Sequence, residues 1–171
     1  MMPSGNMMAQ NIDQHFIVQM IPHHEGAIEM AKVALERSKR PEVISLANGI
    51  IEAQTREIND MKSWYQSWFG SAPPEGGFPA RQSLGAGGGM MGGGMMGGMT
   101  GDTDELARVS DAEFDREFLS QMIPHHEMAI MMAGMLQATT DRAEMKTLAD
   151  NIITSQSREI EMMRGWLKSW Y

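Results

Sequence analysis

Residues 16–35 read FIVQMIPHHEGAIEMAKVAL, and this stretch decides the fold. Apolar side chains recur along it at alternating steps of four and three, beginning with Phe16 and Met20, which is the spacing of one face of an α-helix. His23 and His24 fall on this same apolar side. The stretch therefore predicts an amphipathic helix whose buried side carries two adjacent histidines.

The motif occurs twice in the chain. Met-Ile-Pro-His-His-Glu occupies residues 20–25 and again 122–127, and Gln-x-Arg-Glu-Ile occupies residues 54–58 and again 156–160. Both recurrences are displaced by the same 102 positions, without a gap. A constant displacement over so long a stretch indicates a duplicated unit, so the chain consists of two homologous halves.

Each half contains a second helical pattern after a short turn, which in the first half lies at residues 38–41. From Leu46 to Tyr65 apolar residues again recur at helical steps, with Gln54 and Glu57 set into the same face. Two helices joined by a short turn form a hairpin that cannot cover its own apolar face. We therefore expect an all-α fold, a four-helix bundle built from hairpins at residues 12–69 and 111–171.

Residues 70–105, between the hairpins, are rich in glycine, proline and serine. Such a segment loses much conformational entropy on ordering and offers little apolar area in return, so it predicts a flexible linker within a single domain of residues 1–171. No periodic apolar pattern surrounds its methionines, which we interpret either as a soft-metal scavenging arm or as sacrificial oxidation sites. These linker residues are Met90, Met91, Met95, Met96 and Met99.

Pro22 and Pro124 lie inside the helical patterns, directly before the histidine pairs. Proline removes one backbone hydrogen bond of a helix and bends it. Each proline therefore predicts either a kink that leaves room for a ligand or the place where a helix begins.

Methionine dominates the composition, with 20 residues among 171, while cysteine is absent. Thioethers and neutral imidazoles are polarizable, uncharged ligands that suit Cu(I) and Ag(I), whereas carboxylates favour harder ions. The absence of cysteine is compatible with an oxidising compartment, and equally with the cytosol. The sequence thus predicts a soft-metal site with the candidate ligands Met20, His23, His24, Met30, Met61, Met122, His125, His126, Met128, Met131, Met132, Met135 and Met163.

Two carboxylates have a predicted supporting role. Glu57 and Glu159 fit as partners that accept a hydrogen bond from an imidazole and fix its tautomer. The competing interpretation is structural, because a buried histidine bonded to Glu or Gln is an ordinary way to satisfy core polar groups, and methionine is a common core filler. Beside the main core face, Met128, Met131 and Met135 fit either metal capture or an apolar contact with a partner helix.

Charge and motif content exclude several classes of function. With 22 acidic and 14 basic residues the net charge is -8, so the basic surface that nucleic-acid binding requires is missing. No stretch approaches the roughly 20 apolar residues of a membrane-spanning helix. The chain lacks a cysteine nucleophile, a phosphate loop and the Glu-x-x-His motif of di-iron bundles. We expect a protein without catalytic turnover, the alternatives being a di-metal oxidoreductase and a stress-related bundle whose methionines serve packing or oxidation.

The repeated Met-Ile-Pro-His-His-Glu motif, followed by Gln-x-Arg-Glu, resembles a family of ferritin-like helical bundles long labelled a domain of unknown function, one member of which handles copper. The resemblance covers nearly all residues outside the linker. It implies a ferritin-like bundle, periplasmic or secreted after removal of a signal peptide. It also implies binding of Cu(I), Cu(II) and Ag(I) in copper resistance and homeostasis, with a copper-transport or sensor protein as partner.

The resemblance implies that the family's metal-linked positions correspond to Met20, His23, His24 and Met30 in the first half. In the second half they correspond to Met122, His125, His126 and Met132. The repeats differ at two nearby positions, where Gly26 and Glu29 of the first half correspond to methionines in the second. We therefore expect that the two halves need not bind metal equally.

Overall fold

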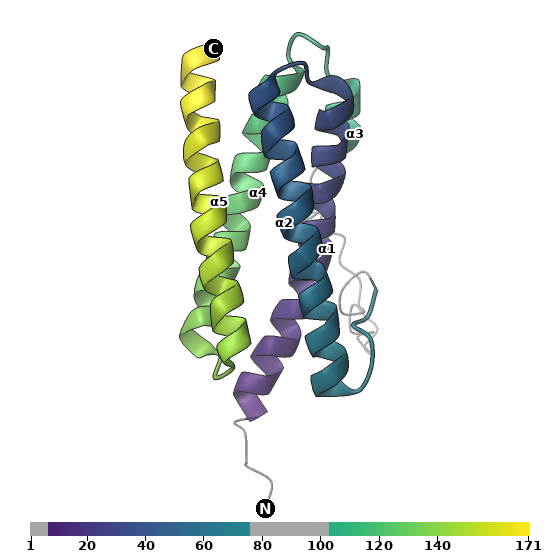
Figure 1. Cartoon of the computed structure of the whole chain (residues 1–171), viewed down its shortest axis with the longest axis vertical. Helices are drawn as coiled ribbons and strands as arrows, with labels where there is room; N and C mark the ends of the chain where they lie inside the picture. The colour runs from purple at the N-terminus through teal and green to yellow at the C-terminus, as the bar shows by residue number, and fades with distance from the viewer. Residues whose placement is uncertain (1–6, 76–102) are drawn as a thin grey trace, which may run out of the picture.

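The computed structural model describes residues 7–75 and 103–171, with side chains from residue 12 onward in the first helix. Regular structure in these ranges is helical throughout and contains no strand, as predicted (Figure 1). The helices are α1 (Met7–Arg37), α2 (Pro41–Phe69), α3 (Thr103–Arg108), α4 (Phe114–Thr139) and α5 (Ala143–Trp170).

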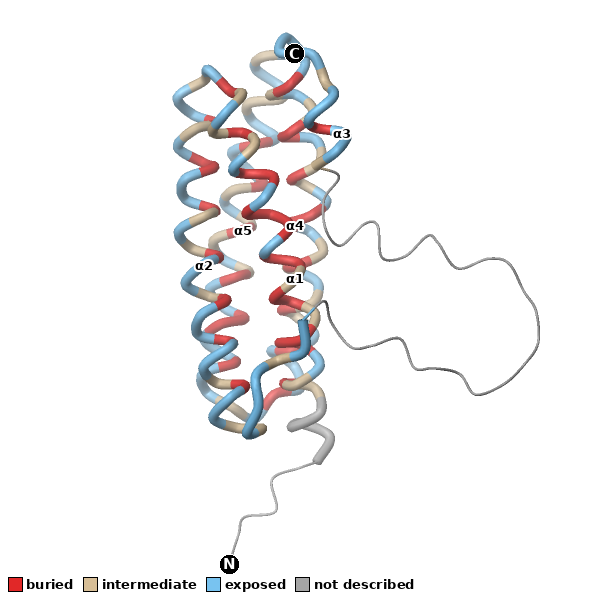
Figure 2. The backbone as a smooth tube through the Cα atoms, turned by 90° about the vertical axis from the view of Figure 1, so that its right-hand side faces the viewer, coloured by how far each residue is buried: buried red, intermediate tan, exposed pale blue. Residues whose placement is uncertain are grey.

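The four long helices form two hairpins, α1 with α2 and α4 with α5, which meet mainly through the contact between α1 and α4 (Figure 1). Each buries one side, so buried positions recur along every helix on the face turned toward its neighbours (Figure 2). This arrangement confirms the predicted all-α bundle of duplicated hairpins. Among the described residues, no helix is both long and apolar enough to span a bilayer.

The turns within the two hairpins are built alike. Ser38 follows α1 and its hydroxyl accepts a hydrogen bond of 3.2 Å from the backbone N–H of Arg40, and Thr140 does the same for Arg142 at 3.1 Å. A side-chain oxygen that accepts from a backbone N–H two residues later stabilises a tight turn. Gly70 follows the last residue of α2 and caps the helix, and its φ of 74° lies in the left-handed region that favours glycine. The hairpin geometry is therefore encoded locally.

The observed helix boundaries differ from the predicted ones in two places, and the structure also decides between the two alternatives left open for the prolines. α3 begins at Thr103, inside the segment expected to be linker, because an acidic first turn favours a helix start and Leu106 supplies a fully buried anchor. α1 begins at Met7, before the expected residue 12. Pro22 and Pro124 lie within continuous helices, so neither marks a helix start. The linker methionines fall outside the described residues.

Two clamps join the hairpins, and each combines a cation, a carboxylate and a tryptophan. Arg142 lies 3.9 Å from the centre of the Trp68 ring and 3.2 Å from a carboxylate oxygen of Asp13. At the counterpart positions, 4.1 Å separates Arg40 from the Trp170 ring and 3.3 Å separates it from Asp115. Each clamp takes its arginine from one hairpin and both its tryptophan and its carboxylate from the other. The sequence analysis did not identify these arginines.

Candidate metal centre

The two histidine pairs meet at the contact between α1 and α4. The ring centres of His23 and His125 lie 3.8 Å apart, with an angle of 34° between the ring planes, and both side chains are buried. These residues are counterparts in the duplication, so their contact lies where the two halves are related by an approximate twofold axis. Burial, with the nearby imidazoles of His125, His24 and His126, lowers the pKa of His23 to about 2. This imidazole is therefore neutral at physiological pH, the form that binds metal.

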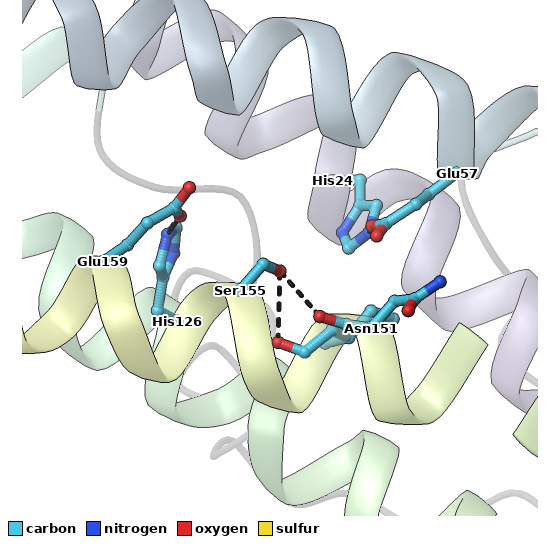
Figure 3. Close-up of polar contacts among 7 residues, drawn as sticks. His24, Glu57, His126, Asn151, Ser155 and Glu159 are labelled. Carbon is cyan, nitrogen blue, oxygen red and sulfur yellow. Dashed lines mark hydrogen bonds and ion pairs between the residues drawn. The ribbon is translucent and has the colours of Figure 1, made fainter. Parts of the chain in front are cut away.

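The second histidine of each pair is held by a glutamate from the other helix of its own hairpin (Figure 3). Nε2 of His24 lies 2.6 Å from a carboxylate oxygen of Glu57, and Nε2 of His126 lies 2.6 Å from Glu159. Both imidazoles are fully buried, whereas the carboxylates remain 14% and 17% exposed. The predicted contact between glutamate and imidazole is present in both halves.

This contact determines which ring nitrogen can bind a ligand. A carboxylate accepts a hydrogen bond from Nε2–H, so Nδ1 of His24 and of His126 carries the lone pair. Neither Nδ1 atom has a hydrogen-bond partner among the described residues, and the same holds for both ring nitrogens of His23. Buried polar atoms are nearly always satisfied, so these unsatisfied nitrogens make the histidine pairs a candidate ligand site.

Five of the predicted methionine ligands are fully buried: Met20, Met30, Met61, Met122 and Met163. They are divided between two core clusters in a way that the sequence did not show. Met20 and Met61 lie in one cluster together with Met145 of the opposite hairpin, and Met132, also of that hairpin, packs against it. The other cluster contains Met122 and Met163 together with Met30, again from the opposite hairpin.

Each cluster thus combines thioethers from both halves, although the first contains one methionine more than the second. Met30 and Met132 are counterparts in the duplication, and each contacts the cluster of the opposite half. Although Met20 and Met30 were predicted together as ligands of the first half, they lie in different clusters. A metal site in either cluster would therefore be assembled from both hairpins.

The other predicted methionines lie nearer the surface. Met128 is half-buried, whereas Met131 and Met135 are 55% and 66% exposed. Met162, which the sequence analysis did not single out, is exposed as well. Because so much of their surface is exposed, Met131 and Met135 contribute little to the packing of the core.

The carboxylates beside the histidines open onto grooves between α2 and α5. Glu57 lines a cavity of about 800 Å³, and Glu159 lines one of about 530 Å³. Asn151 and Ser155 of α5, which border the first cavity, lie on the side of the His24–Glu57 pair that faces α5 (Figure 3). The glutamates therefore stand at the boundary between solvent and the buried imidazoles.

Within residues 7–75 and 103–171, no three side chains of His, Cys, Asp or Glu gather in a geometry suited to one metal ion. A site for a hard cation needs several such oxygen donors, as in di-iron bundles. Here the carboxylates at the centre are engaged with imidazoles, while thioethers occupy the neighbouring core. The donor set fits a soft ion, bound by imidazole nitrogen and thioether sulfur.

The chain belongs to a family of helical proteins described as a domain of unknown function, DUF305, which it matches over residues 13–171. Among solved structures, it is similar to CopM in its Cu(II)-bound form, with 46% identity over 93% of this chain and 97% of that chain, and a TM-score of 0.79. CopM has also been solved in Cu(I)-bound and Ag-bound forms.

Of two further relatives, one is more distant in sequence and the other matches over a short stretch only. A DUF305 fragment from Deinococcus radiodurans shares 29% identity over 94% of this chain and 98% of its own, with a TM-score of 0.75. The uncharacterized protein L153 of Acanthamoeba polyphaga mimivirus is 45% identical over 51 residues. That match spans 34% of the curated relative and 30% of this chain.

Proposed function

We propose that this protein binds Cu(I) through imidazole and thioether ligands in its bundle core, and that it sequesters or delivers the ion without catalytic turnover. The observation that carries the proposal is the set of buried, unsatisfied nitrogens of His23, His24 and His126 between two clusters of fully buried methionines. The solved Cu(I), Cu(II) and Ag forms of CopM, of similar fold and nearly full coverage, support it.

The residues of the proposed site have different roles in binding. Glu57 and Glu159 hold the Nε2–H groups, which leaves Nδ1 of His24 and His126 as donor atoms. The buried thioethers supply neutral sulfur donors. Binding of a monovalent cation therefore does not require the burial of an anionic ligand, which would carry a desolvation cost. The lowered pKa of His23 means that no proton has to leave this ring before it binds an ion.

The proposed setting is copper resistance in the periplasm or outside the cell, with a copper-transport or sensor protein as recipient. The absence of cysteine is compatible with an oxidising compartment, where thioethers remain available as ligands because they do not form disulfides. Fractionation of the source cells checks this setting: a cytosolic location would contradict it, whatever the metal affinity.

Competition with a chromogenic Cu(I) chelator tests the binding function. We expect the double variant Met20→Leu/Met122→Leu to hold Cu(I) at least about tenfold more weakly than the parent, because a thioether is lost from each core cluster. Met145→Leu is the matched control: this methionine is fully buried in the same cluster as Met20, but its counterpart is Val43 and it is not among the candidate ligands. Equal affinity of the parent and the double variant, or failure of the parent to compete, would overturn the proposal.

A further inference from the structure

A solvent-facing cavity of about 470 Å³ lies between α1 and α4, away from the paired histidines. Its lining includes His15 and Gln19 of α1 and Met132 and Met135 of α4. His15 was not singled out by its sequence pattern, since it lies outside the repeated motif. The cavity thus brings one imidazole and two thioethers together at the surface, and of these only Met132 also contacts the candidate metal centre.

The duplication shows that this end of the bundle differs from its counterpart. Glu117 occupies the position equivalent to His15, and Val33 occupies the position equivalent to Met135. At the counterpart end the surface of α1 and α4 is covered by α3, whose Leu106 is fully buried there. Arg37 secures α3 by donating hydrogen bonds of 2.7 Å and 2.6 Å to the carbonyls of Leu106 and Val109.

At the cavity the described residues provide no such cover, and the side chains have changed in kind. The imidazole of His15 lies where the counterpart end has the carboxylate of Glu117, and the exposed thioether of Met135 lies where it has the branched side chain of Val33. Packing does not account for Met135, because 66% of its surface is exposed. Among the residues that line the cavity there is no Asp, Glu, Lys or Arg. Its donors are therefore soft, and its remaining wall is apolar.

We infer that His15, Met132 and Met135 form an additional, peripheral site for a soft monovalent ion, Cu(I) or Ag(I). Nε2 of His15 lies 2.7 Å from the amide nitrogen of Gln19, and an ion bound at Nε2 displaces this amide, which lines the same cavity. Imidazole with two thioethers is a neutral donor set that suits a monovalent ion of this class.

Met132 connects the peripheral site to the core of the bundle. It lines the cavity and also packs against the core cluster that contains Met20 and Met61. An ion captured at the surface is therefore next to the cluster that contains Met20 and Met61, and not to the cluster that contains Met122 and Met163. The site acts as an entry point for ions, and in this role it rests on the proposed copper-binding function.

Titration of the full chain with Ag(I), followed by NMR of ¹³C-labelled methionine methyl groups, tests the site. We expect the Met132 and Met135 methyl signals to shift together, and His15→Gln to raise the Ag(I) concentration for their half-saturation by about tenfold. Met135→Leu should have the same effect on the Met132 signal. Met131→Leu is the matched control, because Met131 is exposed on the same helix but does not line the cavity.

The outcomes separate this inference from the proposed function. If the Met20 and Met122 signals respond while Met135 does not, or if Met135 responds equally in the His15→Gln variant, the peripheral site is refuted and the core function stands. If Met132 and Met135 respond in the expected manner while Met20 and Met122 do not, the peripheral site holds and the proposed core function fails. An equal effect of Met131→Leu would also refute the site.

Discussion

The imidazole rings of His23 and His125 lie with their centres 3.8 Å apart, although the residues are separated by 102 positions of sequence. Two counterparts of a duplication contact each other only near the axis that relates the two halves. This contact places both histidine pairs in one buried layer, so the core of the bundle contains polar groups that an ordinary hydrophobic core would exclude. The predictions below follow from that layer and from the contacts that support it.

Replacement of His23 by leucine separates binding from stability. A buried polar group without a hydrogen bond costs about 1–3 kcal/mol, and both ring nitrogens of His23 are in this state. We expect His23→Leu to leave the free energy of unfolding of the metal-free protein unchanged or to raise it by about 1 kcal/mol, while Cu(I) affinity falls. Urea unfolding and chelator competition measure the two quantities. A variant destabilised by more than about 2 kcal/mol with normal affinity would show that the histidine serves packing.

The metal-free protein should lose stability as the pH falls below about 6.5. The folded state holds the pKa of His23 at about 2, whereas the unfolded chain takes up a proton near the ordinary value of 6.5. Between these values protonation favours the unfolded state, at up to about 1.4 kcal/mol per pH unit for this group. Unfolding free energies measured at several pH values should decline less steeply for His23→Leu than for the parent. Parallel slopes would contradict the assignment.

Removal of a supporting carboxylate should weaken metal binding through the tautomer of its histidine. We expect Glu57→Ala to lower Cu(I) affinity by about 10-fold or more, because Nε2 of His24 loses its partner at 2.6 Å. The nitrogen chemical shifts of His24 report whether Nδ1 remains unprotonated, a property that a purely structural role would not alter. Glu159→Ala makes the matched change at His126 and should leave the His24 signals unaffected.

The two clamps between the hairpins should contribute unequally to stability. Asp13 is only 1% exposed, so Arg142→Met leaves a buried carboxylate without its cation and should cost about 3 kcal/mol. Asp115 and Arg40 are more exposed, and Arg40→Met should cost about 1 kcal/mol or less. Thermal unfolding of the two variants checks the order. Equal losses would mean that the stacking on tryptophan outweighs the ion pair.

Most of the fold could be predicted from the sequence because the decisive signals are local and repeated. Helical spacing identified the hairpins, and the constant displacement of the His-His motif established the duplication. The contact of Glu57 with a histidine could be anticipated because both residues lie on inward faces of adjacent helices. Pro22 was harder to place, since a proline fits both a helix start and a kinked interior, and only the packing on either side decides between them.

The composition of each metal cluster could not be predicted, because it depends on how one hairpin sits against the other. Helical periodicity shows which face of α1 is buried, but not which turn of α1 meets which turn of α4. For this reason Met30 was grouped with the histidines of its own half, whereas it lies in a cluster with Met122. His15 carried no repeated signal, and only the cavity it shares with Met135 distinguishes it from a surface histidine.

The exchange of Met30 and Met132 between the clusters bears on how such a chain arose. A lone hairpin would hold only part of the sulfur atoms of either cluster and one ring of the imidazole pair. An ancestral half-length protein would therefore have had to pair with an identical copy before it could offer a complete core. In the duplicated chain that pairing does not depend on protein concentration, and the two copies can differ, as His15 and Glu117 do at equivalent positions.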